Sequence, residues 1–123
     1  MCGIVGLFLK DKALEPQLGA LLSDMLITMT DRGPDSAGIA IYGPSEAGSG
    51  KITVQSADPA ADFKSLKAAL AKKLGVAVSM TIRATHAVIA VECGKLDAVR
   101  TALKELRPGI TVMGSGESVE IYK

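Results

Sequence analysis

The chain has 123 residues, of which 48% are hydrophobic, 22% are charged and only 3% are aromatic. This length and composition are typical of a globular protein with one domain or two small modules and an aliphatic core. The net charge of +1, from 14 basic and 13 acidic residues, gives no electrostatic reason to expect a nucleic-acid partner.

The cysteines and the hydropathy pattern indicate the cellular compartment of the protein. No apolar stretch reaches the ~18 residues of a transmembrane helix, and the short apolar start lacks the basic segment of a signal peptide. Cys2 and Cys93 are the two cysteines. They do not form a disulfide framework, and free thiols fit a reducing compartment. The sequence therefore predicts a cytoplasmic protein without a membrane partner.

The first half of the chain predicts strands around one helix. Residues 4–9 are continuously apolar and predict a buried strand that holds Cys2 at a sheet end. Apolar residues at helical spacing predict a helix over about residues 15–30, with its apolar stripe packed on a sheet. Residues 36–42 predict the next strand, and residues 51–55 predict the returning strand of a hairpin.

The second half predicts helices and strands in alternation. In chain order these are a helix over 63–74, strands over 76–83 and 87–91, a helix over 96–106, a strand over 110–112, a turn over 114–116 and a strand over 119–121. If residues 51–55 begin this series, the order is β-α-β-β-α-β, as in a ferredoxin-like unit, with one further strand. Residues 51–55 could instead belong to the preceding hairpin.

Cys2 is the first candidate for chemistry. Removal of Met1 would leave a thiol and a free α-amine on one residue, and the reference pKa of that amine is about 7.7–8.0. The amine can then take the thiol proton, and a nucleophile beside a base is the minimum for covalent attack on an amide. Taken alone, Cys2 is more simply explained as a small residue that follows the initiator methionine.

A second motif favours the chemical interpretation. Met-Cys-Gly-Ile-Val-Gly over residues 1–6 is followed, after one helix, by Arg-Gly-Pro-Asp-Ser-Ala-Gly over residues 32–38. This pair resembles the class II glutamine amidotransferases, which are N-terminal-nucleophile (Ntn) hydrolase domains, and the resemblance covers about residues 1–55. It implies that Cys2 is the catalytic nucleophile, which attacks the side-chain amide of glutamine, forms a thioester and releases ammonia.

The resemblance also implies roles for the second motif. Arg32 matches the arginine close to the nucleophile, and we take it as the substrate-binding candidate, because a cation there favours the thiolate. The alternative is a structural ion pair between Arg32 and Asp31 or Asp35. The other motif residues are expected to have structural roles in the loop: Gly33, Pro34, Asp35 and Gly38.

No metal site is expected from the remaining candidate ligands. His86 is the only histidine, and one histidine with Cys93 does not make a zinc site. A polar residue at a strand end is the better interpretation of His86, and Cys93 is interpreted as structural or incidental.

The expected fold class is α+β, in two parts. Residues 1–57 are expected to form the N-terminal part of an Ntn-hydrolase αββα fold. Residues 58–123 are expected to form an inserted or appended module, with a ferredoxin-like βαββαβ-type arrangement. The family supplies its oxyanion donors from an Asn-Gly pair in the second half of the domain, whereas this sequence contains no asparagine. We therefore expect an incomplete domain with little glutaminase activity on its own.

Among the family, the motifs look most like the amidotransferase subunits of glutamate synthase and N-methylglutamate synthase. That resemblance implies glutamine as substrate and either synthase subunits or a missing C-terminal half as partners, and a homo-oligomer is also possible. FMN and iron–sulfur clusters would belong to the synthase subunits, with no cofactor site in this chain. The alternative function is a non-catalytic binding or assembly module of a synthase complex.

Overall fold

The computed structural model describes residues 3–33 and 35–123. They fall into two compact units, Met1–Ala37 and Gly38–Lys123. The first unit contains the 3-10 helix η1 (Lys12–Gln17), helix α1 (Leu18–Ile27) and the 3-10 turn η2 (Thr30–Arg32). All of the strands described below lie in the second unit.

The helix predicted over residues 15–30 is confirmed in its central part. Asp11 begins the helical segment, because its carboxylate accepts a hydrogen bond from the Ala13 N–H at 2.9 Å. Pro16 lies inside η1, and the regular α-helix begins only at Leu18. None of the described α1 residues is buried, so the predicted packing of its apolar stripe on a sheet stays a prediction.

The strand predicted over residues 4–9 is wrong. The described structure has no strand there, and the side chains of Ile4 and Phe8 are 96% and 85% exposed. An apolar segment becomes a strand only when a neighbouring strand pairs with its N–H and C=O groups. Among the described residues, every strand pairing lies within Gly38–Lys123, so this segment has no such neighbour.

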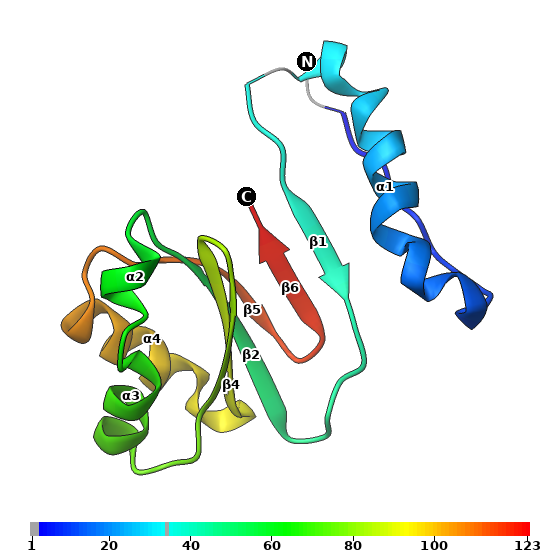
Figure 1. Ribbon diagram of the computed structural model, residues 1–123. Coiled ribbons are helices and arrows are strands. Elements are labelled where there is room, and N and C mark those ends of the chain that lie inside the picture. Colours follow the sequence, from blue (N-terminus) through cyan, green and yellow to red (C-terminus); the bar gives the residue numbers. More distant parts are fainter. Residues whose placement is uncertain (1–2, 34) are drawn as a thin grey trace. The chain divides into compact units, whose positions relative to one another are not determined.

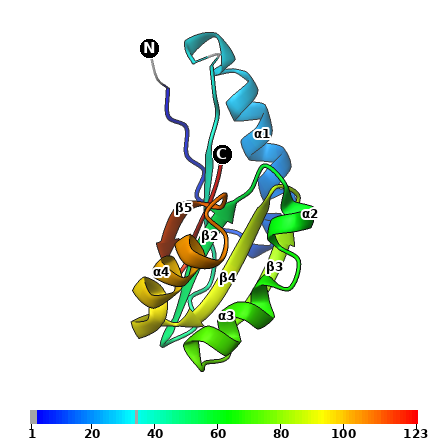
Figure 2. The ribbon, with the colours of Figure 1, turned by 90° about the vertical axis from the view of Figure 1, so that its left-hand side faces the viewer.

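The second unit contains a four-stranded antiparallel sheet with the strand order β3-β4-β2-β5 (Figure 2). In chain order its elements are β2 (Ser49–Gln55), α2 (Pro59–Asp62), α3 (Leu66–Leu74), β3 (Ser79–Arg83), β4 (His86–Glu92), η3 (Cys93–Lys95), α4 (Leu96–Leu106) and β5 (Thr111–Gly116). The predicted β-α-β-β-α-β order is confirmed. The helix predicted over residues 63–74 corresponds to α3, and the short helix α2 precedes it. The ferredoxin-like fold itself remains a prediction that this order supports.

The core of the second unit lies between this sheet and helices α3 and α4. Ile52 and Ile89 of the sheet and Leu70 of α3 are each 0% exposed and belong to one apolar cluster. Burying side chains of this size contributes about 1.5–3 kcal/mol each. The predicted end of the helix over residues 63–74 is also confirmed, because α3 ends at Leu74 and Gly75 adopts φ +65°, a left-handed conformation that favours glycine.

Strands β1 (Ile39–Tyr42) and β6 (Val119–Tyr122) form a separate two-stranded antiparallel ribbon (Figure 1). Ile39 lies opposite Tyr122, and Tyr42 lies opposite Val119. The hairpin predicted between residues 36–42 and 51–55 is therefore wrong, because β1 pairs with β6 and β2 joins the four-stranded sheet.

The turn predicted over residues 114–116 is also wrong, because these residues continue β5. A Cβ placed on Gly114 would lie 2.5 Å from Cδ1 of Ile121, and one on Gly116 would lie 2.8 Å from Cγ1 of Val119. Both glycines therefore allow the side chains of β6 to approach the backbone of β5. Glycines are favoured both where two strands approach closely and in turns, so the sequence pattern is the same in the two cases.

The predicted domain boundary between residues 57 and 58 follows β2 in the chain. Strand β2 pairs with β4 over seven residue pairs, from Ser49 opposite Glu92 to Gln55 opposite His86, and it pairs with β5 on its other side. Structurally, β2 therefore belongs with the elements after the boundary. The division into an N-terminal part of an amidotransferase domain over residues 1–57 and an inserted or appended module over residues 58–123 stays a prediction.

The ribbon is attached to the four-stranded sheet through side chains. Thr53 of β2 is 0% exposed, and its hydroxyl oxygen accepts a hydrogen bond from the Ile121 N–H at 3.2 Å. Gln55 donates from Nε2 to the carbonyl oxygen of Lys123 at 2.8 Å. The Lys123 N–H donates to Nε2 of His86 at 3.2 Å.

We expect Thr53→Val to destabilise the chain by about 1–3 kcal/mol, because valine keeps the shape but leaves the Ile121 N–H without its acceptor. The measurement is the free energy of unfolding from urea titration. Thr111→Val is the matched control, because Thr111 is an exposed β5 residue, and it should change stability by less than about 0.5 kcal/mol. Equal effects of the two variants would contradict the assigned hydrogen bond.

Candidate functional site

Two of the predicted site residues lie outside the described residues. These are Cys2, the predicted nucleophile, and Pro34 of the second motif. The site is therefore built from the residues beside them, Gly3 on one side and the Arg32–Asp35 loop on the other.

Within the first unit, Gly3 lies against the end of the helical segment. A Cβ placed on Gly3 would lie 3.8 Å from Cβ of Arg32 and 3.8 Å from Sδ of Met29, and it would overlap the Met29 methyl group. Gly3 is the neighbour of Cys2, and Arg32 begins the second motif. The structure thus brings the two motifs together, although 28 residues separate Gly3 from Arg32 in the sequence.

Arg32 ends η2, whose backbone hydrogen bonds fix its position. Its N–H donates to the carbonyl oxygen of Met29 at 3.0 Å, and the next N–H, of Gly33, donates to Thr30 at 3.2 Å. Arg32 is exposed. Among residues 3–33 and 35–123 it forms no ion pair with Asp31 or Asp35. The structural ion pair considered as an alternative is thus not formed, and the guanidinium is available to an anionic group.

The other motif residues show no contact that by itself explains their identity. Gly33 has φ −160°, an extended conformation that any residue adopts. A Cβ on Gly38 would lie 3.4 Å from the carbonyl oxygen of Tyr122, which is an ordinary contact distance. Asp35 is exposed. Their structural role in the motif stays a prediction.

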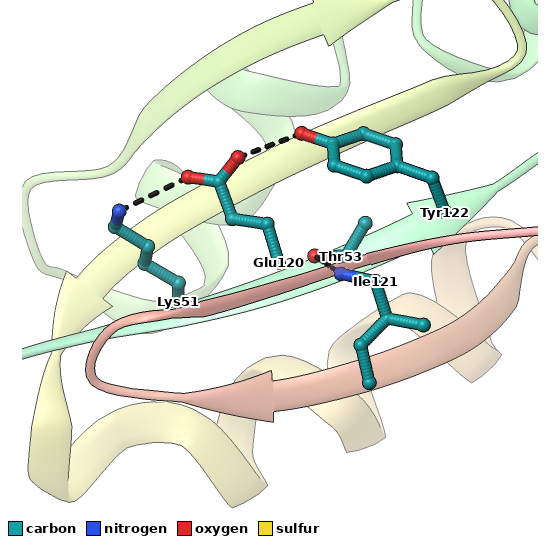
Figure 3. A network of polar contacts seen from close by, with 5 residues as sticks. All are labelled: Lys51, Thr53, Glu120, Ile121 and Tyr122. Carbon is teal, nitrogen blue, oxygen red and sulfur yellow. Dashed lines mark hydrogen bonds and ion pairs between the residues drawn. The ribbon is translucent and has the colours of Figure 1, made fainter. Parts of the chain in front are cut away.

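A polar network that the sequence analysis missed joins β2 to β6 (Figure 3). Nζ of Lys51 lies 3.0 Å from Oε1 of Glu120, and the Tyr122 hydroxyl donates to Oε2 of the same carboxylate at 2.7 Å. The side chains of Lys51 and Glu120 are 22% and 24% exposed, so the pair is largely shielded from water. The alternation of polar residues in Lys51-x-Thr53 and Glu120-x-Tyr122 is the sequence signal that could have indicated it.

This network shifts the pKa values of Glu120 and Tyr122. Burial raises the pKa of Glu120, but the hydrogen bonds from Tyr122 and Lys51 and the positive charges of Lys51 and Arg83 outweigh it, so the net pKa is lowered below 4.5. Burial and the adjacent Glu120 carboxylate raise the pKa of Tyr122 to about 12. Both shifts favour the state in which a neutral phenol donates to a charged carboxylate.

We expect stability to fall at both ends of the pH range. The pKa of Glu120 is lower in the folded chain than its value of 4.5 in the unfolded chain, so the charged carboxylate stabilises the fold above pH 4.5. This stability is lost as the pH falls through the folded-state pKa. The raised pKa of Tyr122 makes the unfolded chain release its proton first, so stability falls between pH 10 and about pH 12. Unfolding free energies measured from pH 3 to 12 test this.

Glu120→Gln should reduce the pH dependence at both ends, since it removes the carboxylate that both shifts involve. Glu105→Gln is the control, because the ion pair of Glu105 with Lys73 has side chains that are 55% and 40% exposed. Identical pH profiles for Glu120→Gln and the unmodified chain would contradict this assignment.

His86 and Cys93 both lie in the second unit. His86 begins β4 and is 7% exposed, and its ring packs edge-on against Tyr122 with the centroids 5.4 Å apart. Cys93 begins η3, with Sγ 4.0 Å from Oε1 of Glu117. The described residues contain no group of three or more potential metal ligands. Nor does any described helix have the length and apolar character needed to cross a membrane.

Comparison with known proteins finds two similar proteins. The chain is 59% identical, over all of its 123 residues, to the glutamine amidotransferase-like protein GlxB of Rhizobium meliloti (strain 1021), and this match covers 40% of that protein. It is 54% identical over 43 residues to a putative glutamine amidotransferase of Methanothermobacter thermautotrophicus (strain Delta H), a match that covers 35% of this chain and 14% of that protein. No protein-family model and no solved structure matches.

One of these proteins is named as glutamine amidotransferase-like and the other as a putative glutamine amidotransferase, and together they support a glutamine amidotransferase domain in this chain. The chain spans 40% of the length of GlxB, the relative that it matches from end to end. The resemblance drawn from the two sequence motifs is confirmed at this level. The class of amidotransferase and the chemistry of Cys2 are proposals.

Proposed function

We propose that this chain is part of a class II glutamine amidotransferase with an Ntn-hydrolase fold, in which Cys2 releases ammonia from glutamine. The observation that carries the proposal is the 59% identity, over all of this chain and 40% of the relative, to a glutamine amidotransferase-like protein, in a chain whose second residue is a cysteine. The contact of Gly3 with Arg32 supports it, because the residue beside the proposed nucleophile lies against the proposed substrate-binding residue.

The proposed reaction has two steps. After removal of Met1, the α-amine of Cys2 takes the thiol proton, and the sulfur attacks the side-chain carbonyl carbon of glutamine. The tetrahedral intermediate collapses with cleavage of the C–N bond, and the proton passes to the leaving nitrogen, so that ammonia departs and a thioester remains. Water then attacks the thioester, which releases glutamate and restores the thiol.

Arg32 is proposed to act by its charge. Its guanidinium is exposed and forms no ion pair within the described residues, so it can pair with the substrate carboxylate or favour the Cys2 thiolate. A bidentate contact with a carboxylate would also fix the orientation of glutamine relative to the sulfur. Lysine at this position would keep the charge but lose the planar fork of donors.

The chain is proposed to work with further polypeptide. Stabilisation of the oxyanion needs donors aimed at the developing negative charge, and the asparagine that serves this purpose in the family has no counterpart in this sequence. The donors would come from synthase subunits or from another part of the amidotransferase domain. We propose that the ammonia passes to a partner like glutamate synthase in the cytoplasm, and that this chain alone is inactive.

A binding or assembly module without catalysis is the second candidate. The absence of asparagine favours it, because an amide hydrolase without oxyanion donors loses roughly 100- to 1,000-fold in rate for each donor removed. In this alternative the second unit would contact a synthase partner, and Cys2 would have no chemical role.

An intact-mass measurement distinguishes the two candidates. The chain is treated with a glutamine-like diazo-ketone electrophile, alone and together with the polypeptide that completes the site. The enzyme proposal expects loss of the Met1 mass and one adduct, located on Cys2 by peptide mapping, with Cys93 unmodified. A retained methionine, or no adduct even in the complete preparation, would leave the assembly module as the function.

A further inference from the structure

A hollow of about 300 Å³ opens on one face of the four-stranded sheet. Alternate residues of a strand point to opposite faces. Ile52 and Ile89 point into the core that α3 and α4 share, so Lys51 and Val88 point to the other face. The residues that line the hollow and carry charge or hydroxyl groups include Lys51, Ser79, Thr81, Arg83, Glu117 and Glu120.

The strand register gives the hollow two different ends. Arg83 lies in the row with His86 and Gln55, whereas Ser79 lies in the row with Ala90 and Lys51. These rows are four residues apart, or roughly 13 Å at about 3.3 Å per residue.

Two loop carboxylates line the hollow at the end away from Arg83. Glu117 directly follows Gly116, the partner of Lys51. Glu46 precedes β2, and its carbonyl oxygen accepts from the Ser49 N–H at 2.9 Å. Arg83 is therefore at one end, and Glu46 and Glu117 are at the other.

The charges that line the hollow are only partly matched within the chain. Lys51 pairs with Glu120 across 3.0 Å, and the positive charge of Arg83 also acts on Glu120, whose pKa it helps to lower. The single carboxylate of Glu120 thus faces two cations. In the part of the chain that the structure describes, Arg83, Glu46 and Glu117 form no ion pair. Because all three are exposed, each can accept a partner from solution, with an anion at the Arg83 end and a cation at the end with the two glutamates.

We propose that this hollow binds an elongated zwitterion, with a carboxylate at one end and an ammonium group at the other, of the size of a basic amino acid. The carboxylate pairs with the guanidinium of Arg83, and the distal ammonium lies between Glu46 and Glu117. The hydroxyl groups of Ser79 and Thr81 provide neutral hydrogen-bonding partners along the floor. A volume of about 300 Å³ is at the lower end of the range for small-molecule sites. This site does not depend on the proposed amidotransferase reaction.

The test is a titration of the full chain with L-lysine and three analogues at low salt, followed by NMR shifts of the Ser79 and Thr81 amides. Cadaverine lacks the carboxylate, norleucine lacks the distal ammonium, and 6-aminohexanoate lacks only the α-ammonium. We expect 6-aminohexanoate to bind within threefold of lysine, and cadaverine and norleucine to bind at least fivefold more weakly. Failure of lysine to bind saturably at 10 mM, or equal binding of all four compounds, would overturn the proposal.

Variants assign the two ends separately. Arg83→Gln should abolish the preference for lysine over cadaverine and keep the preference over norleucine, and Glu117→Gln should weaken the preference over norleucine. Arg83→Lys should restore the first preference, while Lys67→Gln, an equal loss of charge on the exposed surface of α3, should change no ratio. Circular dichroism of each variant checks the fold. Unchanged ratios in folded Arg83→Gln would overturn the assignment of the carboxylate end.

Discussion

Replacement of Cys2 by serine should reduce glutamine-dependent ammonia release by at least about 1,000-fold, in a preparation that contains the polypeptide completing the site. The loss is expected because a serine hydroxyl is far less nucleophilic than a thiolate, and removal of a covalent nucleophile costs several orders of magnitude in other hydrolases. The measurement is ammonia formed from glutamine under saturating substrate, with free ammonia tested separately as the nitrogen donor. Synthesis from free ammonia should continue, since it bypasses the thioester.

Cys93→Ser is the matched control, because Cys93 is the chain's other cysteine and lies at the start of η3 in the second unit. It should leave ammonia release within about twofold of the unmodified protein. If Cys2→Ser kept more than a tenth of the activity, Cys2 would not be the nucleophile, and the assembly module would become the better interpretation.

Leu70→Ala should destabilise the second unit by about 2–5 kcal/mol. The side chain of Leu70 is 0% exposed and packs in the cluster that includes Ile52 and Leu103, so its truncation leaves a cavity between α3 and the sheet. Alanine is the better helix former, so helix propensity does not contribute to the loss. The free energy of unfolding from urea titration measures the effect.

Lys67→Ala is the control for Leu70→Ala, because Lys67 is an exposed residue of the same helix. Its effect should be within about 0.5 kcal/mol. A loss below about 1 kcal/mol for Leu70→Ala would mean that the packing between α3 and the sheet does not contribute substantially to stability.

The periodicity of the sequence predicted the second unit much better than the first. Helices α3 and α4 and strands β3 and β4 were predicted in order, because the helices bury a periodic apolar face and β4 is an almost continuously buried run. Asp58 caps the short helix α2, since its carboxylate accepts from the Ala61 N–H at 3.1 Å. Local sequence patterns of this kind are therefore sufficient to predict where a helix or strand begins and which of its residues are buried.

Strand partners were not predictable in the same way. Nothing local to residues 36–42 indicates that their partner is β6 and not the nearer β2, because both are short and apolar on alternate residues. Similarly, the apolar run of residues 4–9 predicts burial but cannot supply a neighbouring strand. Register and partner choice depend on contacts between distant segments, which a single sequence does not display.

The candidate site was predicted from the two motifs, and the structure adds one contact. The proximity of Gly3 to Arg32 follows from the path of the chain around α1, which no spacing rule gives. The network of Lys51, Glu120 and Tyr122 was missed because Lys51 and Glu120 are 69 positions apart in the sequence and the three residues carry no motif.

The pairing of β1 with β6 has a consequence for how this region can vary. Tyr42 lies opposite Val119, and the Gly43 N–H donates to the carbonyl oxygen of Ser118 at 3.0 Å. The segment from residue 43 to residue 118 therefore begins and ends at adjacent positions at one end of the ribbon. A folded segment with adjacent ends adds little entropic cost to the hairpin that carries it. A replacement for this segment would have to supply the acceptor that Thr53 offers to the Ile121 N–H, so that the two strands of the ribbon keep their register.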